Sequence, residues 1–160
     1  MRNVCRATIV AIVSLSMQLA SAQIYSQQPE APIVTAAQIQ TLQNDKKYQD
    51  RFVIVDVRAK AETDVSIIPG AITQAEFLKT HKQHQGKAVL VYCTVGFRSG
   101  KYAKKLRKKG WNAWNYEGSI LDWCQNQLPV VTKDGKKTKR VHTYNSSYSV
   151  AKGYQAVYER

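Results

Sequence analysis

Short apolar runs alternate with longer polar segments along most of this chain. The runs at 51–57, 89–92 and 111–116, with a brief one at 71–72, are rich in β-branched and aromatic residues and predict strands. Helices are predicted around and between them, at 35–44, 59–64, 75–82, 101–109 and 118–127. Because the run at 51–57 is too continuous for a half-exposed strand, we expect it at the centre of a parallel sheet. The pattern therefore predicts an α/β fold, a parallel β-sheet flanked by helices.

Two of the predicted helices carry signals for the side that faces inward. Thr35 is a candidate N-cap for the first, in which Ile39 and Leu42 are spaced to face the core. In the helix at 75–82 the apolar residues are Phe77 and Leu78, and we expect both to pack inward.

The N-terminus has the pattern of a signal peptide over residues 1–22. Two arginines precede an apolar run that ends in Ala20-Ser21-Ala22, the small-x-small form of a cleavage site. The run is shorter than the roughly 20 residues that a membrane span needs. We therefore expect an exported protein, periplasmic or secreted, with no membrane span after cleavage; the alternative is a retained N-terminal anchor.

The rest of the chain divides into three parts. Residues 23–34 are polar with two prolines and predict an extended lead-in, and 35–130 form the main domain. Residues 131–160 are a basic, tyrosine-rich C-terminal extension. The segments 130–133 and 139–144 flank Asp134-Gly135 and predict a hairpin or a long ribbon. Its tyrosines are expected to pack across the domain, namely Tyr144, Tyr148, Tyr154 and Tyr158.

The chemistry of the sequence gathers at Cys93, where a predicted strand passes into a predicted helix. Backbone N–H groups at a helix N-terminus are unpaired and favour an anion, so a thiolate is stabilised there and its pKa should fall below about 8.5. Gly96 allows the positive φ that lets the N–H groups of Thr94 to Ser99 converge on the sulfur. Arg98 adds a rigid cationic fork suited to an oxyanion.

The stretch from Cys93 to Arg98 resembles the active-site loop of the rhodanese family, sulfurtransferases that carry sulfur as a cysteine persulfide. Three further stretches resemble family motifs in the same order: Asp56-Val57-Arg58 after the first strand, the Ile68-Pro69-Gly70-Ala71 turn, and Gly118 followed by Trp123. The chain departs from the family where Ser66-Ile67 replaces the usual Gly-His and where Ser119 replaces the second glycine.

The resemblance implies a rhodanese-like domain over 35–130 and a sulfur relay through Cys93, with no cofactor and no metal. An anionic, thiosulfate-like donor would give its sulfur to Cys93, and a thiol, cyanide or a protein acceptor would remove it. Donor and sulfur would be bound by Arg98, Thr94, Val95, Gly96, Phe97 and Ser99. Asp56 and Arg58 are expected to be mainly structural and to fix the neighbouring loops through hydrogen bonds and an ion pair.

The net charge of +13 becomes +11 once Arg2 and Arg6 are removed, and much of it follows the loop in the helix at 101–109. A positive field would draw small anions toward Cys93. The signal peptide argues against a nucleic-acid partner, while attraction to anionic membrane surfaces stays open.

Several alternatives remain open on the sequence alone. Related Cys-Arg loops perform phosphatase or arsenate reductase chemistry, but only four residues separate Cys93 from Arg98, which is one fewer than those loops usually hold. The domain could instead be a non-enzymatic module that binds a partner. Cys124 could pair with Cys93, although a buried structural thiol is the favoured interpretation. His81 and His84 have a spacing that a metal site could use, without a further ligand nearby.

Overall fold

The computed structural model describes residues 23–28 and 30–158. The predicted signal peptide at 1–22 lies outside the described residues. Among the residues described, no helix is both long enough and apolar enough to cross a membrane.

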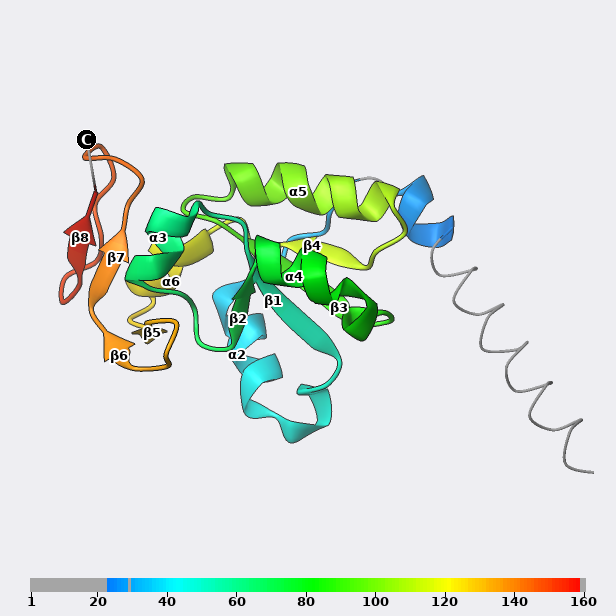
Figure 1. Ribbon diagram of the computed structural model, residues 1–160, viewed down its shortest axis with the longest axis horizontal. Helices are drawn as coiled ribbons and strands as arrows, with labels where there is room; N and C mark the ends of the chain where they lie inside the picture. Colours follow the sequence, from blue (N-terminus) through cyan, green and yellow to red (C-terminus); the bar gives the residue numbers. More distant parts are fainter. Residues whose placement is uncertain (1–22, 29, 159–160) are drawn as a thin grey trace, which may run out of the picture.

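The core of the molecule is a parallel sheet of four strands (Figure 1). The strands are β1 (Phe52–Asp56), β2 (Ala71–Thr73), β3 (Ala88–Tyr92) and β4 (Ala113–Asn115), in the order β2-β1-β3-β4. Every neighbouring pair is parallel, with Phe52 opposite Ala88 and Asp56 opposite Tyr92 in the central pair. This confirms the predicted α/β fold.

Helices cover both faces of the sheet, as the apolar run at 51–57 predicts. They are α2 (Ala36–Asn44), α3 (Lys60–Val65), α4 (Gln74–Thr80), α5 (Phe97–Lys108) and α6 (Ser119–Gln125), with 3-10 turns η1 (Lys46–Tyr48) and η2 (His81–His84). Because successive strand residues point to opposite faces, Val53 and Val55 pack with α4 and α5, whereas Ile54 packs with α2 and α6.

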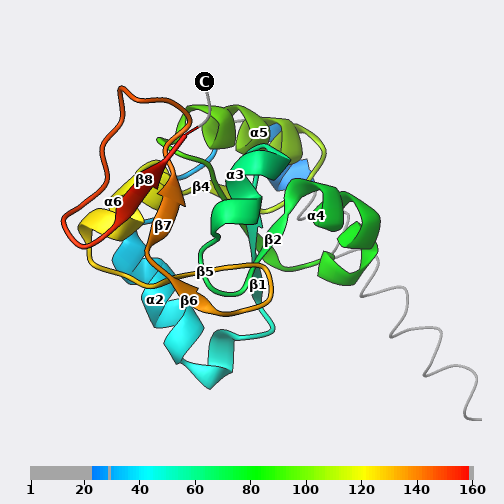
Figure 2. The same ribbon diagram turned by 60° about the vertical axis from the view of Figure 1, so that its left-hand side comes forward.

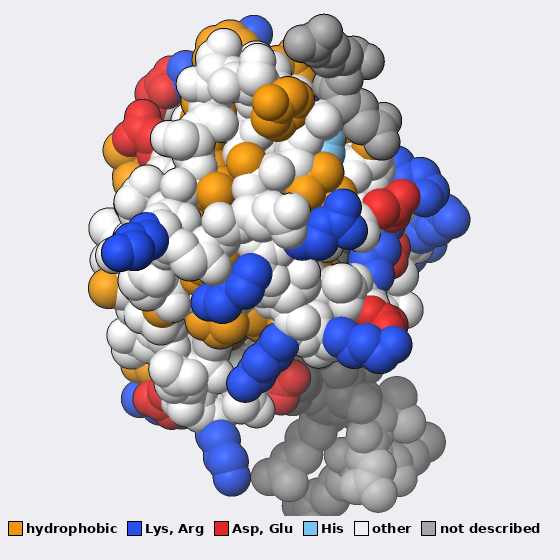
Figure 3. Space-filling view, turned by 90° about the vertical axis from the view of Figure 1, so that its left-hand side faces the viewer, with side chains coloured by type: hydrophobic (Ala, Val, Ile, Leu, Met, Phe, Trp, Pro, Cys, Tyr) orange, Lys and Arg blue, Asp and Glu red, His pale blue; other side chains and the backbone are white. Residues whose placement is uncertain are grey.

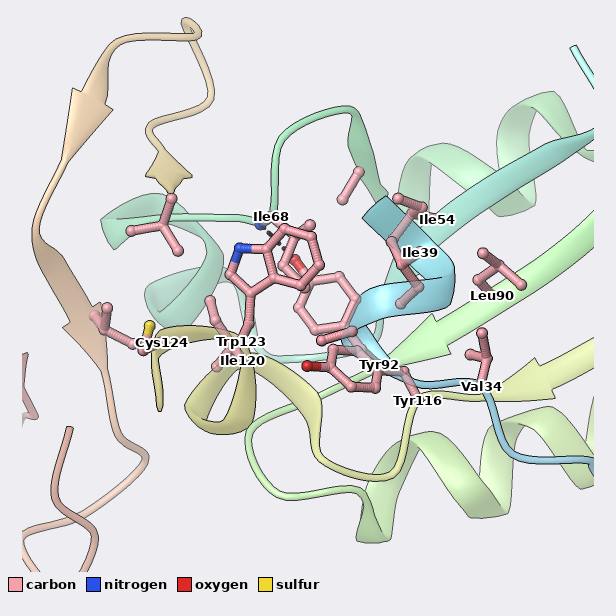
Figure 4. Close-up of a cluster of buried hydrophobic side chains, with 14 of the residues drawn as sticks. Val34, Ile39, Ile54, Ile68, Leu90, Tyr92, Tyr116, Ile120, Trp123 and Cys124 are labelled. Carbon is pink, nitrogen blue, oxygen red and sulfur yellow. Dashed lines mark hydrogen bonds between the residues drawn. The ribbon is translucent and has the colours of Figure 1, made fainter. Parts of the chain in front are cut away.

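The core on the α2 and α6 side is the more aromatic of the two (Figure 4). Trp123 and Tyr116 meet edge to face with ring centroids 6.3 Å apart. Tyr92 extends from the end of β3 into the same core, where its hydroxyl accepts a hydrogen bond of 3.0 Å from Ile68 N–H. Cys124 lies in this cluster as well.

Helix α2 begins as predicted, and α4 differs in one respect. The Thr35 hydroxyl accepts from Gln38 N–H while Gln38 bonds back to Thr35 N–H, a reciprocal capping box. In α4, Phe77 is buried, but Leu78 is 56% exposed and the prediction for it is wrong. Adjacent helix positions are about 100° apart, so two consecutive residues of this short amphipathic helix do not both face the core.

The C-terminal extension forms the predicted hairpin over Asp134-Gly135, but with a nearer second strand than predicted (Figure 2). β5 (Val130–Val131) is antiparallel to β6 (Lys137–Thr138), whereas β7 (Arg140–His142) pairs in parallel with β8 (Gln155–Val157). The segment 139–144 is therefore wrong as a hairpin partner for 130–133. Val141 of β7 is buried in the α6-side core, which holds β7 against the domain and leaves the closer strand β6 to pair with β5.

Of the four extension tyrosines, Tyr154 is the one that is half-buried against the domain core. Its hydroxyl donates to the Leu128 carbonyl at 2.6 Å. Tyr144, Tyr148 and Tyr158 are 57%, 38% and 45% exposed. These three side chains are therefore largely exposed, although the Tyr144 ring lies against Arg98 of α5.

The lead-in is partly helical rather than extended. Residues 23–27 form a helical turn, and Arg107 of α5 holds it by donating from Nε to the Gln28 carbonyl at 2.6 Å and by lying 5.3 Å from the Tyr25 ring. Further on, the lead-in meets the sheet, because Val34 N–H donates to the Asn115 carbonyl of β4 at 3.0 Å.

Candidate active site

The predicted reactive loop lies at the carboxyl end of the sheet, between the end of β3 at Tyr92 and the start of α5 at Phe97. In open parallel sheets this is the edge where ligands bind. Gly96 adopts the expected positive φ of 92°, and a Cβ on it would lie 2.2 Å from the Glu117 carbonyl oxygen. Only glycine fits this position, and its N–H donates to Cys93 Sγ at 3.2 Å.

Hydrogen-bond donors surround the sulfur of Cys93, and the residue is only 1% exposed. Besides Gly96 N–H, the Ser99 hydroxyl lies 3.6 Å and the Ser119 hydroxyl 3.8 Å from Sγ. Burial by itself raises the pKa of the Cys93 thiol, but the N–H and hydroxyl of Ser99, the N–H of Val95 and the hydroxyl of Ser119 outweigh it. The pKa therefore lies below its ordinary value, and the thiolate is favoured.

Ser119 occupies the place of the family's second glycine in a left-handed conformation, with φ of 55°. Its buried hydroxyl accepts from Cys93 N–H at 3.0 Å, and its one hydrogen is shared between the Tyr116 carbonyl at 2.9 Å and Cys93 Sγ at 3.8 Å. The strained serine thus ties the start of α6 to the reactive loop, which a glycine could not do.

Arg98 lies beside the pocket and is bound to a residue that sequence reasoning did not identify, Glu62 of α3. Its Nη1 and Nη2 donate to the two Glu62 oxygens at 2.6 and 2.7 Å, and Nη2 also donates to the Thr94 hydroxyl at 2.7 Å. Glu62 accepts two more bonds of 2.9 Å, from the Thr94 hydroxyl and from Ala59 N–H.

Glu62 stays ionised in this setting. Burial by itself raises the pKa of its carboxyl, but the bonds from Arg98, Ala59 and Thr94 prevail and lower it from 4.5 to about 2. The sequence offered one weak signal for this residue, an acidic side chain in the first turn of the helix after Asp56-Val57-Arg58. Arg98 is 36 positions away from Glu62, so no local sequence pattern indicates that the two residues form a pair.

Asp56 and Arg58 form a pair of their own under the loop. Arg58 Nη2 donates to Asp56 at 2.7 Å and to the Ser66 carbonyl at 2.6 Å, and both side chains are fully buried. The Arg58 guanidinium also lies 5.7 Å from the Tyr92 ring centroid. These contacts join the end of β1 to the segment after α3, and neither residue lines the Cys93 pocket.

The pocket at Cys93 has a volume of about 290 Å³. Loop and extension residues line it together: Cys93, Thr94, Val95, Phe97, Arg98, Tyr144 and Tyr148. The rim is apolar, since Val95 is 39% and Phe97 67% exposed. The two tyrosines come from the C-terminal extension, about 50 positions after Cys93, and no local pattern in the sequence indicates that they lie at the site.

The second cysteine is separate from this pocket. Cys93 and Cys124 are both free thiols, and burial raises the pKa of Cys124 to about 12. Within residues 23–28 and 30–158, no group of three or more His, Cys, Asp or Glu side chains is arranged to hold a metal ion. His84 instead stacks on Phe77 with ring centroids 5.7 Å apart.

The same region of the chain matches a known family. The Rhodanese-like domain model covers residues 35–126, which contain the parallel sheet, the Cys93 loop and α6. The chain belongs to the rhodanese-like domain family. An uncharacterised protein of Synechocystis sp. is 33% identical over 92 residues, 53% of this chain and 50% of that protein, so the chain spans about half the length of this curated relative.

Solved rhodanese-like structures share the fold. A rhodanese-related protein from Thermoplasma volcanium is 25% identical with a TM-score of 0.51, over 62% of this chain and 97% of that one. A thiosulfate sulfurtransferase from Pseudomonas aeruginosa is 16% identical with a TM-score of 0.56, over 68% of this chain and 21% of that one. The latter likeness is one of fold alone. The C-terminal extension after residue 126 lies beyond the family match.

Proposed function

We propose that this rhodanese-like protein is a sulfurtransferase that carries a sulfane sulfur as a persulfide on Cys93. The observation that carries the proposal is the state of the Cys93 sulfur: it is buried, its pKa is lowered, and N–H and O–H groups converge on it. A structural cysteine needs none of these donors, whereas each of them stabilises a terminal persulfide anion.

In the first step the Cys93 thiolate attacks the outer sulfur of a donor such as thiosulfate. The new bond joins Cys93 Sγ to that sulfur, the sulfur–sulfur bond of the donor breaks, and its electron pair leaves with sulfite. Cys93 becomes a persulfide anion with the same single charge as the thiolate. In the second step cyanide or a thiolate attacks the outer sulfur, and the Cys93 thiolate is regenerated.

Arg98 is the cation available to the donor. An arginine has five N–H donors, and three of those of Arg98 bind Glu62 and Thr94, which leaves Nε and one Nη1 hydrogen for a donor oxyanion. The pairing with Glu62 cancels much of the charge of Arg98 and fixes its orientation. Lys and Arg side chains are also spread over the face of the molecule that carries the extension, among fewer acidic ones, and support attraction of an anion (Figure 3).

Export is part of the proposal and rests on Arg2, Arg6 and the apolar run before Ala20-Ser21-Ala22. The mature protein recovered from the exported fraction should begin at Gln23. Recovery only as the full-length chain would contradict it.

Intact mass after incubation with thiosulfate tests the persulfide. The parent and Cys124→Ala should each gain one sulfur atom, since Cys124 is buried with a high pKa, and Cys93→Ser should gain none. The lowered pKa of Cys93 should also appear as alkylation by iodoacetamide with a midpoint below about pH 8.5.

The rival functions give different results in the same experiment. A mass two hydrogens short of the reduced chain would reveal a Cys93–Cys124 disulfide. A fully reduced, unmodified Cys93 would refute thiosulfate transfer. In that case release of phosphate from p-nitrophenyl phosphate would support phosphatase chemistry, and its absence the partner-binding module.

A further inference from the structure

The Cys93 pocket is not built by the rhodanese-like domain alone. The segment that joins β7 to β8 lies beside the N-terminal end of α5, next to the reactive loop (Figures 1 and 2). It contributes Tyr144 and Tyr148 to the pocket lining, although both lie beyond the family match at 35–126.

Tyr144 is held in this position by its backbone. Its φ of 72° is in the left-handed region, which tyrosine rarely occupies and which persists only where the surroundings impose it. Two bonds impose it here: Tyr144 N–H donates to His142 Nδ1 at 3.0 Å, and the preceding Thr143 N–H donates to the Val157 carbonyl of β8 at 2.9 Å. Thr143 itself is fully buried.

The tyrosine ring that results from this conformation covers Arg98. The Arg98 guanidinium lies 5.2 Å from the Tyr144 ring centroid, within the range of a cation–π contact. Along its edge the guanidinium is bound by the Glu62 carboxylate. The parallel pairing of β7 with β8 thus positions an aromatic side chain against the arginine of the reactive loop.

The two rings narrow the approach to the sulfur. Cys93 is 1% exposed at the base of the pocket, and about 290 Å³ is just below the range of about 300–1,000 Å³ that drug-sized ligands occupy. Cyanide or a short unbranched thiol is small relative to a pocket of this volume, whereas a peptide-sized thiol is too large to enter it whole.

We propose that Tyr144 and Tyr148 are specificity-determining residues that admit slender sulfur acceptors to the Cys93 persulfide and obstruct bulky ones. This inference rests on the proposed sulfurtransferase function. The acceptor class it names is a small thiol or cyanide.

Sulfur transfer from the persulfidated protein to two thiols of different bulk tests the inference. The rate constant for glutathione is divided by that for 2-mercaptoethanol, so that changes common to both acceptors cancel. Tyr144→Ala, Tyr148→Ala and the double variant should each raise this ratio, by about tenfold in the double variant, the usual scale of steric discrimination in a pocket. Tyr144→Phe and Tyr148→Phe keep the rings and should leave the ratio within about twofold of the parent.

Tyr158→Ala is the matched control, because Tyr158 is an exposed tyrosine of the same extension that does not line the pocket. Its ratio should equal that of the parent. An unchanged ratio in the double alanine variant, or an equal rise in Tyr158→Ala or the phenylalanine variants, would overturn the inference. Circular dichroism confirms that each variant is folded, and the single variants serve where the double one is not.

A second measurement separates this inference from the function on which it rests. The Cys93 thiol is alkylated with iodoacetamide and with the bulkier N-phenylmaleimide, and the modified peptide is identified by mass. If no persulfide forms at all, the proposed function fails. Removal of the Tyr144 and Tyr148 rings should still raise the ratio of the alkylation rate with N-phenylmaleimide to that with iodoacetamide in the alanine variants. Equal ratios of alkylation rates in parent and variants would show that Tyr144 and Tyr148 do not obstruct access to Cys93.

Discussion

Replacing Glu62 by Gln tests the network that holds Arg98. The substitution keeps the size of the side chain and removes its charge. A carboxyl whose pKa is 2.5 below its unfolded value of 4.5, at about 2, contributes about 3 kcal/mol to the free energy of unfolding at neutral pH. The glutamine amide would also point an N–H₂ group at Arg98 or Ala59, which are both donors, so one buried donor loses its partner.

Hydration should offset part of this loss in the free energy of unfolding. The Glu62 side chain is only 3% exposed, but that of Arg98 is 33% exposed, and water can solvate its guanidinium after the ion pair is removed. We therefore expect Glu62→Gln to lower the free energy of unfolding at pH 7 by about 2–3 kcal/mol.

Urea unfolding of the parent and the variant at several pH values measures this difference and its sign. Because the pKa of the Glu62 carboxyl is lowered on folding, its contribution is fully present above pH 4.5 and is lost as the pH falls toward about 2. The two unfolding curves should therefore converge on acidification. A difference below about 1 kcal/mol at pH 7, or one that stays constant at acidic pH, would refute the reasoning.

Glu76→Gln is a matched control for the capping role of Glu62. The Glu76 carboxylate accepts a hydrogen bond of 2.7 Å from the N–H of Thr73, three residues earlier, just as Glu62 accepts one from Ala59. Unlike Glu62, Glu76 is exposed, and its hydrogen bonds are to Thr73 rather than to an arginine. Since glutamine also completes a capping box, this change should cost less than about 1 kcal/mol. A loss as large as that of Glu62→Gln would assign the effect to capping rather than to Arg98.

Two further positions around Cys93, Gly96 in the loop and Ser119 at the start of α6, give testable expectations. Gly96→Ala forces a Cβ to within 2.2 Å of the Glu117 carbonyl in a left-handed residue, so it should destabilise the fold by more than about 1 kcal/mol and raise the midpoint of Cys93 alkylation; a variant as stable as the parent would contradict the geometry. Ser119→Ala and Ser119→Gly both remove the acceptor of Cys93 N–H, but glycine relieves the φ of 55°, and thermal unfolding should find it more stable than alanine by about 1 kcal/mol. Equal melting temperatures of these two variants would show that the serine backbone is not strained.

The sequence determined the features of this protein that depend on neighbouring residues. The β-branched run at 51–57 predicted a strand covered on both faces, and Thr35 predicted the start of a helix; the structure has both. The reactive loop belongs to this class as well. A cysteine at a strand end, a glycine at a left-handed position and a helix start within six residues define one backbone path, and the structure has that path.

Features that join distant parts of the chain were decided by tertiary structure alone. Glu62 reaches Arg98 across 36 positions because α3 lies next to the loop after β3, where the Thr94 hydroxyl also donates to Glu62. Tyr144 reaches the same arginine from the segment between β7 and β8, and β7 lies against α3. The hairpin over Asp134-Gly135 formed, but its second strand is 137–138 rather than 139–144, because Val141 is buried in the core and takes its strand away from 130–133. Local sequence fixes the conformation of a few residues, but the free energy of burial over the whole domain selects which segments meet.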